Sequence, residues 1–79
     1  MLTGHADWKE ILTVTDEDQR SFVFYCGWGV EPPAAYVAAE ADWRRCVPVW
    51  LHERREEVIA LMESMGHVVH EGRYPDWRG

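Results

Sequence analysis

Ser21-Phe22-Val23-Phe24-Tyr25-Cys26 is the stretch that decides the fold of this 79-residue chain. It is dense in aromatic and β-branched residues, which favour β-strands. Because side chains alternate along a strand, Phe22, Phe24 and Cys26 share one face, and the residues between them share the other. Both faces are apolar, so we expect a central strand with at least one side fully covered by other elements.

The segments on either side of this strand predict the rest of the fold. β-branched residues indicate another strand before the polar loop that precedes Ser21. Downstream, the apolar residues recur at helical spacing, and Pro48 suits the first turn of a helix. Gly66 is the expected left-handed residue after this helix. The expected elements are strands at 11–15, 21–26, 34–39 and 67–70, a helical turn at 40–46 and a long helix at 49–65.

These elements predict an α+β fold with two layers. A long amphipathic helix needs an apolar surface to lie on. A mostly antiparallel sheet of three or four strands supplies that surface, with the helix packed across it. The position at which the last strand pairs stays open. The chain has room for one domain over residues 1–79, and we expect residues 1–7 and 72–79 to be loosely ordered.

The charge balance excludes several classes of function. Fourteen acidic and eight basic residues give a net charge of −6, whereas a protein that binds nucleic acid needs a basic patch. No apolar run reaches the roughly 18–20 residues of a membrane span, and the first residues do not form a signal peptide. We therefore expect a small acidic soluble protein of the cytoplasm, of bacterial or phage type, with neither a nucleic-acid nor a membrane partner.

Five tryptophans are many for so small a chain. About two should lie in the core, because each buries roughly 150–250 Å². Exposed Trp and Arg side chains are typical of protein interfaces. Arg54 falls within the apolar stripe of the helix. There it either covers the sheet edge with its methylene groups, or is held at a partner-facing groove or paired with a strand acid. The predicted partner-binding patch, called the Trp/Arg patch below, consists of Trp28, Trp43, Arg44, Arg45, Trp50 and Arg54.

Cysteine and histidine offer an alternative site. Without a signal peptide, the two cysteines are expected to be reduced. In a strand, His67 and His70 point to opposite faces, which is poor geometry for a single metal ion. No nucleophile signature and no glycine-rich phosphate loop accompanies these residues. We therefore expect neither an enzyme nor a cofactor, and an alternative metal or small-ligand site would use Cys26, Cys46, His67 and His70.

Together these features predict a protein–protein interaction module, such as an inhibitor or an antitoxin-like or immunity-like adaptor. It would bind through the Trp/Arg patch, and its acidic surface would favour a basic partner. The partner is expected to be another protein or a second copy of the chain, because an exposed aromatic patch can pair with itself. Two alternatives stay open. One is a small-ligand or metal-binding domain that uses Cys and His, and the other is the structural subunit of a homodimer.

Overall fold

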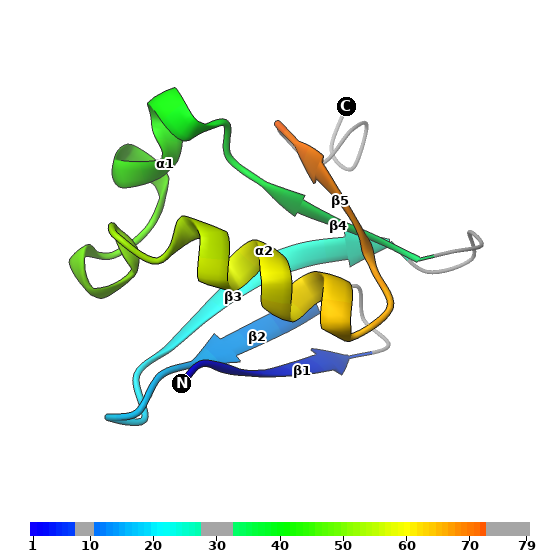
Figure 1. The fold of residues 1–79 in the computed structure, drawn as a ribbon, viewed down its shortest axis with the longest axis horizontal. Helices are drawn as coiled ribbons and strands as arrows, with labels where there is room; N and C mark the ends of the chain where they lie inside the picture. Colours follow the sequence, from blue (N-terminus) through cyan, green and yellow to red (C-terminus); the bar gives the residue numbers. More distant parts are fainter. Residues whose placement is uncertain (8–10, 28–32, 73–79) are drawn as a thin grey trace.

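Five segments of the chain form one mixed sheet: β1 (Thr3–Asp7), β2 (Ile11–Thr15), β3 (Ser21–Gly27), β4 (Ala34–Val37) and β5 (Val68–Glu71). A computed structural model shows them side by side in sequence order (Figure 1). The structure describes residues 1–7, 11–27 and 33–72. Neighbouring strands are antiparallel from β1 to β4, whereas β5 runs parallel to β4. The predicted α+β class with a mostly antiparallel sheet is therefore confirmed.

The sheet has five strands rather than the expected three or four. The additional strand is β1, which lies in the stretch that we expected to be a loose start. Two features hold it in place. Its register with β2 runs from Thr3 opposite Thr15 to Asp7 opposite Ile11. Leu2 before it is only 3% exposed and belongs to the core. Short strands that begin with polar residues give a weak sequence signal, because pairing rather than side-chain type stabilises them.

The helical layer also differs from the prediction of one long helix. It consists of α1 (Glu40–Cys46), a 3₁₀ turn η1 (Val49–Leu51) and α2 (Arg55–Ser64). The carbonyl of Leu51 accepts hydrogen bonds from the backbone N–H of Arg54 at 3.0 Å and from the Trp43 indole at 2.9 Å. These bonds replace the helical bond between residues four apart. The predicted helix therefore breaks between η1 and α2. Among the described residues, no helix is long and apolar enough to cross a membrane.

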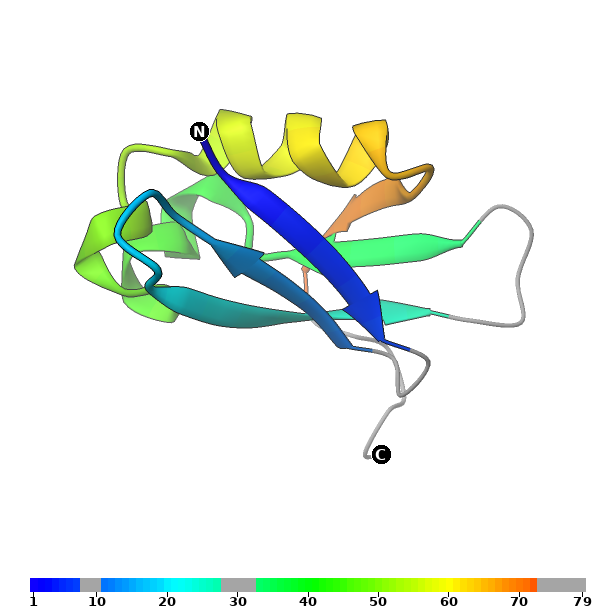
Figure 2. The same cartoon turned by 90° about the horizontal axis from the view of Figure 1, so that it is seen from below.

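The connection between β4 and β5, residues 38–67, carries all of these helices, and Gly66 near its end has the expected positive φ of 93°. Figure 2 shows α2 lying over one face of the sheet, which we call the inner face. In the part of the chain that the structure describes, no helix covers the opposite side, the outer face (Figure 2). The described part of the chain therefore has two layers, as predicted, with its helices on one side of the sheet.

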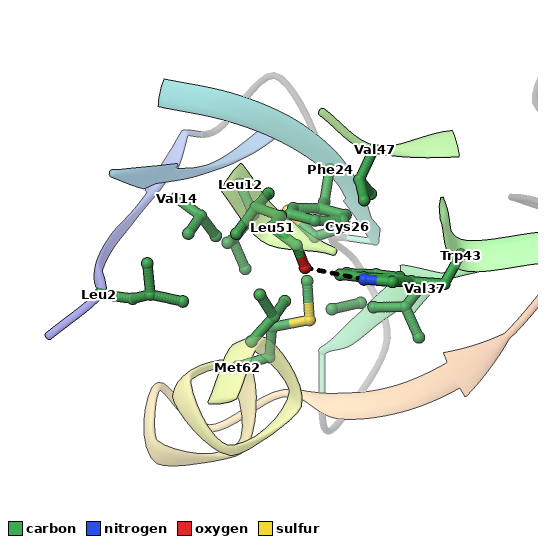
Figure 3. Close-up of a cluster of buried hydrophobic side chains, with 12 residues drawn as sticks. Leu2, Leu12, Val14, Phe24, Cys26, Val37, Trp43, Val47, Leu51 and Met62 are labelled. Carbon is green, nitrogen blue, oxygen red and sulfur yellow. Dashed lines mark hydrogen bonds between the residues drawn. The ribbon is translucent and has the colours of Figure 1, made fainter. Parts of the chain in front are cut away.

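The core lies between the inner face and the helices (Figure 3). Within it the rings of Phe24 and Trp43 are stacked, with centroids 6.0 Å apart. At the β1 edge, a Cβ atom added to Gly4 would lie 2.7 Å from the sulfur of Met65, so glycine allows the helix to approach this strand. The buried apolar cluster consists of Leu2, Leu12, Val14, Phe24, Cys26, Ala35, Val37, Trp43, Val47, Leu51, Val58 and Met62.

Candidate functional site

Trp43, a central member of the predicted Trp/Arg patch, is a core residue. Only 2% of it is exposed, and its ring packs against Phe24 (Figure 3). Its indole N–H donates to the Leu51 carbonyl, so the polar atom of the side chain is satisfied inside the protein. The expectation that Trp43 contacts a partner is therefore wrong. The sequence did not distinguish this tryptophan from an exposed one because its neighbours, Arg44 and Arg45, are both exposed.

The other members of the Trp/Arg patch do not form one surface. The exposed Arg44 and Arg45 are engaged by Glu53 and Asp42 respectively. Trp50 is half-buried and packs against the core, with the guanidinium of Arg20 5.4 Å from the ring centroid. Trp28 lies outside the described residues, as do Trp8 and Trp77. Among the described residues, Trp43 therefore belongs to the core and Trp50 packs against it.

Arg54 pairs with two acids, but neither is the strand acid that was considered, because Glu17 lies in the turn between β2 and β3 and Glu57 lies in α2. Its guanidinium makes two hydrogen bonds to Glu17, at 2.8 and 2.9 Å, and two to Glu57. The terminal amine of Met1 also contacts Glu17. These hydrogen bonds lower the pKa of Glu17 well below its ordinary value and raise the pKa of Arg54. The cluster ties the turn between β2 and β3 to the start of α2, which gives Arg54 a structural role.

The alternative Cys and His site is not assembled. Cys26 is buried on β3, whereas Cys46 is exposed at the end of α1. His67 is buried, and His70 lies on β5 with its ring stacked on Tyr36 at 5.5 Å. Within residues 1–7, 11–27 and 33–72, no three His, Cys, Asp or Glu side chains lie close enough together to hold a metal ion. Cys26, Cys46, His67 and His70 therefore do not form the metal site that was considered.

A charged cleft of about 220 Å³ opens between α1, η1 and the start of α2. Its groups are largely engaged with one another. The ring nitrogens of His52 lie 3.4 Å from Arg44 and 3.2 Å from the Val47 carbonyl. Arg55 donates to the Ala38 carbonyl and to Glu71. Because these charged groups already have partners within the protein, the cleft is better suited to a structural role than to activating a substrate. The lining residues are Glu40, Trp43, Arg44, His52, Glu53, Arg55 and Glu56.

The outer face of the sheet has a different chemistry. Val23 is 46% exposed, Tyr25 41% and Val68 44%. The pairing register places Tyr25 beside Ile11 and Tyr36 beside His70. Thr15 and Ser21 share a hydrogen bond of 3.0 Å at one end of the face. By strand alternation, the positions on the outer face of β2 to β5 are Ile11, Thr13, Thr15, Ser21, Val23, Tyr25, Ala34, Tyr36, Val68 and His70.

None of these ten positions is Asp, Glu, Lys or Arg, although such residues make up 28% of the chain. The helical layer between residues 40 and 64 carries ten charged residues. On β1 the register adds Thr3, His5 and Asp7 to the same face, so its one acid lies on an edge strand. Among the described residues, three of the five exposed large apolar side chains, Val23, Tyr25 and Val68, lie on the outer face. This pattern makes the outer face the candidate site, because a contiguous exposed apolar surface marks an interaction site.

Comparisons with protein-family models, curated proteins and solved structures gave no match. The candidate site therefore depends on the geometry of this chain alone. Sequence reasoning did place Val23 and Tyr25 together on one face of the central strand. It did not include them among the candidate site residues, because it assigned the candidate surface to tryptophan and arginine. The signal for the outer face was the apolar character of both faces of 21–26, since a strand with only one covered face needs apolar residues on one side only.

Proposed function

We propose that this protein is a protein–protein interaction module that binds through the outer face of its sheet. The observation that carries the proposal is the exposure of Val23, Tyr25 and Val68 on a face where β2 to β5 present no charged residue. Burying apolar surface stabilises a complex by about 25 cal/mol per Å² removed from water. A charged partner surface would have to give up its hydration here without gaining an opposite charge. The partner surface is therefore itself largely uncharged.

The outer face replaces the Trp/Arg patch in this proposal. Trp43 is buried and Arg54 is engaged by Glu17 and Glu57, so neither offers a free group to a partner. The proposed roles are those of an inhibitor, an antitoxin-like protein or an immunity-like adaptor. These roles are named by analogy with the size and charge of the chain.

A matched pair of substitutions tests the proposal. Val23→Lys places a charge on the outer face, whereas Val49→Lys places the same charge on η1, where Val49 is 79% exposed. Both exposed sites should tolerate lysine, and circular dichroism with thermal unfolding checks that the fold is kept. We expect the protein captured by the tagged chain from its source cells to be lost with Val23→Lys and retained with Val49→Lys. Equal capture by both variants would refute the outer face as the binding surface.

A further inference from the structure

We propose that the partner on the outer face is a second copy of this chain, so that two sheets pack face to face in a symmetric dimer. This inference rests on the proposed function and specifies its partner. A symmetric dimer uses the same patch on both copies, so the patch must be complementary to itself. The outer face meets that condition in its β2 to β5 part, where valine and tyrosine are exposed and no residue is charged, whereas Asp7, which the register places opposite Ile11, lies at the β1 edge.

The distribution of charge on the rest of the molecule supports this choice. Each copy has a net charge of −6, which opposes contact between two copies over most of their surfaces. The helical side carries Glu53, Glu56 and Glu63 at exposed positions. These acids lie on the side of the sheet opposite the outer face. The helical layer between residues 40 and 64 carries six acids and four arginines, whereas the outer positions of β2 to β5 carry neither, so two copies that approach through their outer faces bring the fewest charges together.

The size of the face agrees with a dimer that depends on concentration. The molecule measures 32 × 23 × 18 Å along its principal axes, and the sheet lies behind α2 in the plane of the two longer axes (Figure 1). The 32 by 23 Å outline encloses about 740 Å², which is comparable to the about 800 Å² that each partner buries in a standard interface. The expected dimer lies just below that standard, so it should dissociate on dilution.

The two-fold symmetry of the proposed dimer predicts which residues of the outer face meet each other, which a general apolar contact would not. β3 is the third of five strands, so Val23 lies near the centre of the outer face, whereas Val68 lies on the edge strand β5. Stacked sheets lie about 10 Å apart with their strands roughly aligned. A two-fold axis near the centre of the face brings the two copies of Val23 towards each other. A charge introduced there meets its own symmetry mate, whereas a charge at Val68 lies nearer the rim and remains partly hydrated.

Analytical ultracentrifugation of the full chain tests this inference. We expect the wild type to shift from 9.2 kDa towards twice that mass as its concentration rises. Raising the salt concentration from about 0.05 M to about 0.5 M should increase the dimer fraction, because salt screens the repulsion between two acidic copies. Val23→Lys should abolish the dimer, Val68→Lys should weaken it, and Val49→Lys should leave it unchanged. A wild type that stays at 9.2 kDa at every concentration overturns the inference.

A charge-reversal experiment distinguishes symmetry from general stickiness. Val23→Lys and Val23→Glu should each be monomeric alone, and an equimolar mixture of the two should recover the mass of a dimer. The corresponding pair at Val49 should not respond to mixing. Failure of the mixture to associate would contradict the placement of Val23 beside the two-fold axis. If the wild type is monomeric and yet captures a different protein in a Val23-dependent manner, the proposed function stands and the second copy is ruled out as the partner.

Discussion

The two faces of this sheet are built from alternate residues of the same strands, yet they differ in almost every respect. On β3, Phe24 and Cys26 are 6% and 0% exposed, whereas Val23 and Tyr25 beside them are 46% and 41% exposed. The inner face is covered by α2 and by the α1 tryptophan, and the outer face has no helix over it in the described part of the chain (Figure 2). The difference teaches that the inner face supplies the core and that the outer face is the one accessible to the proposed partner, because a buried residue cannot reach a partner and an exposed one contributes little to the core.

The largest expected loss of stability comes from removing a large side chain from the core on the inner face. Trp43→Ala removes the ring that stacks on Phe24 and the indole that donates to Leu51. We expect it to lower the free energy of unfolding by about 3–5 kcal/mol. Val23→Ala on the outer face should lower it by less than about 1 kcal/mol, since surface substitutions change stability little. Urea denaturation followed by circular dichroism measures both, and equal losses would remove the distinction between the faces.

A smaller effect is expected where a helix comes closest to the sheet edge. Gly4→Val on β1 introduces a branched side chain where a Cβ atom alone would lie 2.7 Å from Met65 and 3.2 Å from Leu61. Overpacking of this kind costs about 1–3 kcal/mol of stability. Adding Met65→Ala should restore part of the loss by making room. A Gly4→Val chain as stable as the wild type in thermal unfolding would show that β1 is not held against the helix.

The two faces of β3 and the helical layer could be predicted from sequence, whereas β1, the position of β5 and the burial of Trp43 could not. The alternation at 21–26 gave the two faces of β3, and helical spacing beyond Pro48 indicated the covering layer. β1 was missed because its polar residues are held by backbone pairing to β2. The parallel position of β5 could not be predicted, since pairing between distant segments leaves no local signal. Trp43 was misassigned because burial depends on the whole fold, whereas sequence shows only neighbours along the chain.

The next substitution is expected to raise the free energy of unfolding rather than lower it. His67 lies immediately before β5 and is 6% exposed, and neither of its ring nitrogens has a hydrogen-bond partner among the described residues. An unsatisfied buried polar group costs about 1–3 kcal/mol. His67→Leu should therefore raise the free energy of unfolding by about 1–2 kcal/mol. His70→Leu on the outer face provides the control and should change stability by no more than about 0.5 kcal/mol. A loss of stability with His67→Leu would mean that the imidazole makes contacts that leucine cannot replace.

The smallest effect concerns acids at the border between the two layers. Burial raises the pKa of Asp16, but hydrogen bonds from Arg20 and from the backbone of Arg20 and Asp18 outweigh it and lower the pKa. Hydrogen bonds from Arg54 also lower the pKa of Glu17 and of Glu57. A carboxyl with a lowered pKa stabilises the fold above its ordinary pKa and loses this contribution as the pH falls towards the lowered one.

Stability should therefore decline as the pH drops below about 4.5, the ordinary pKa of Glu17. Glu17→Gln should make this decline shallower by a modest amount, because exposed ion pairs are screened by solvent. Thermal unfolding measured from pH 7 to pH 3 checks both statements. Thr13→Ala on the outer face is the control and should follow the wild-type curve. An unchanged slope in Glu17→Gln would mean that its pairing with Arg54 does not contribute to the native state.

The β2–β3 and β4–β5 connections differ in length, and this difference sets the order in which the strands can pair during folding. β2 and β3 are separated by five residues, 16–20, whereas β4 and β5 are separated by thirty residues, 38–67. Closing the longer connection costs about 1.6 kcal/mol more in chain entropy. The β1–β3 meander can therefore form early, and β5 can pair only once the helical connection has folded back over the sheet. Until then both apolar faces of β3 are exposed to solvent, so docking of the helices ends the period in which the folding chain is most prone to aggregation.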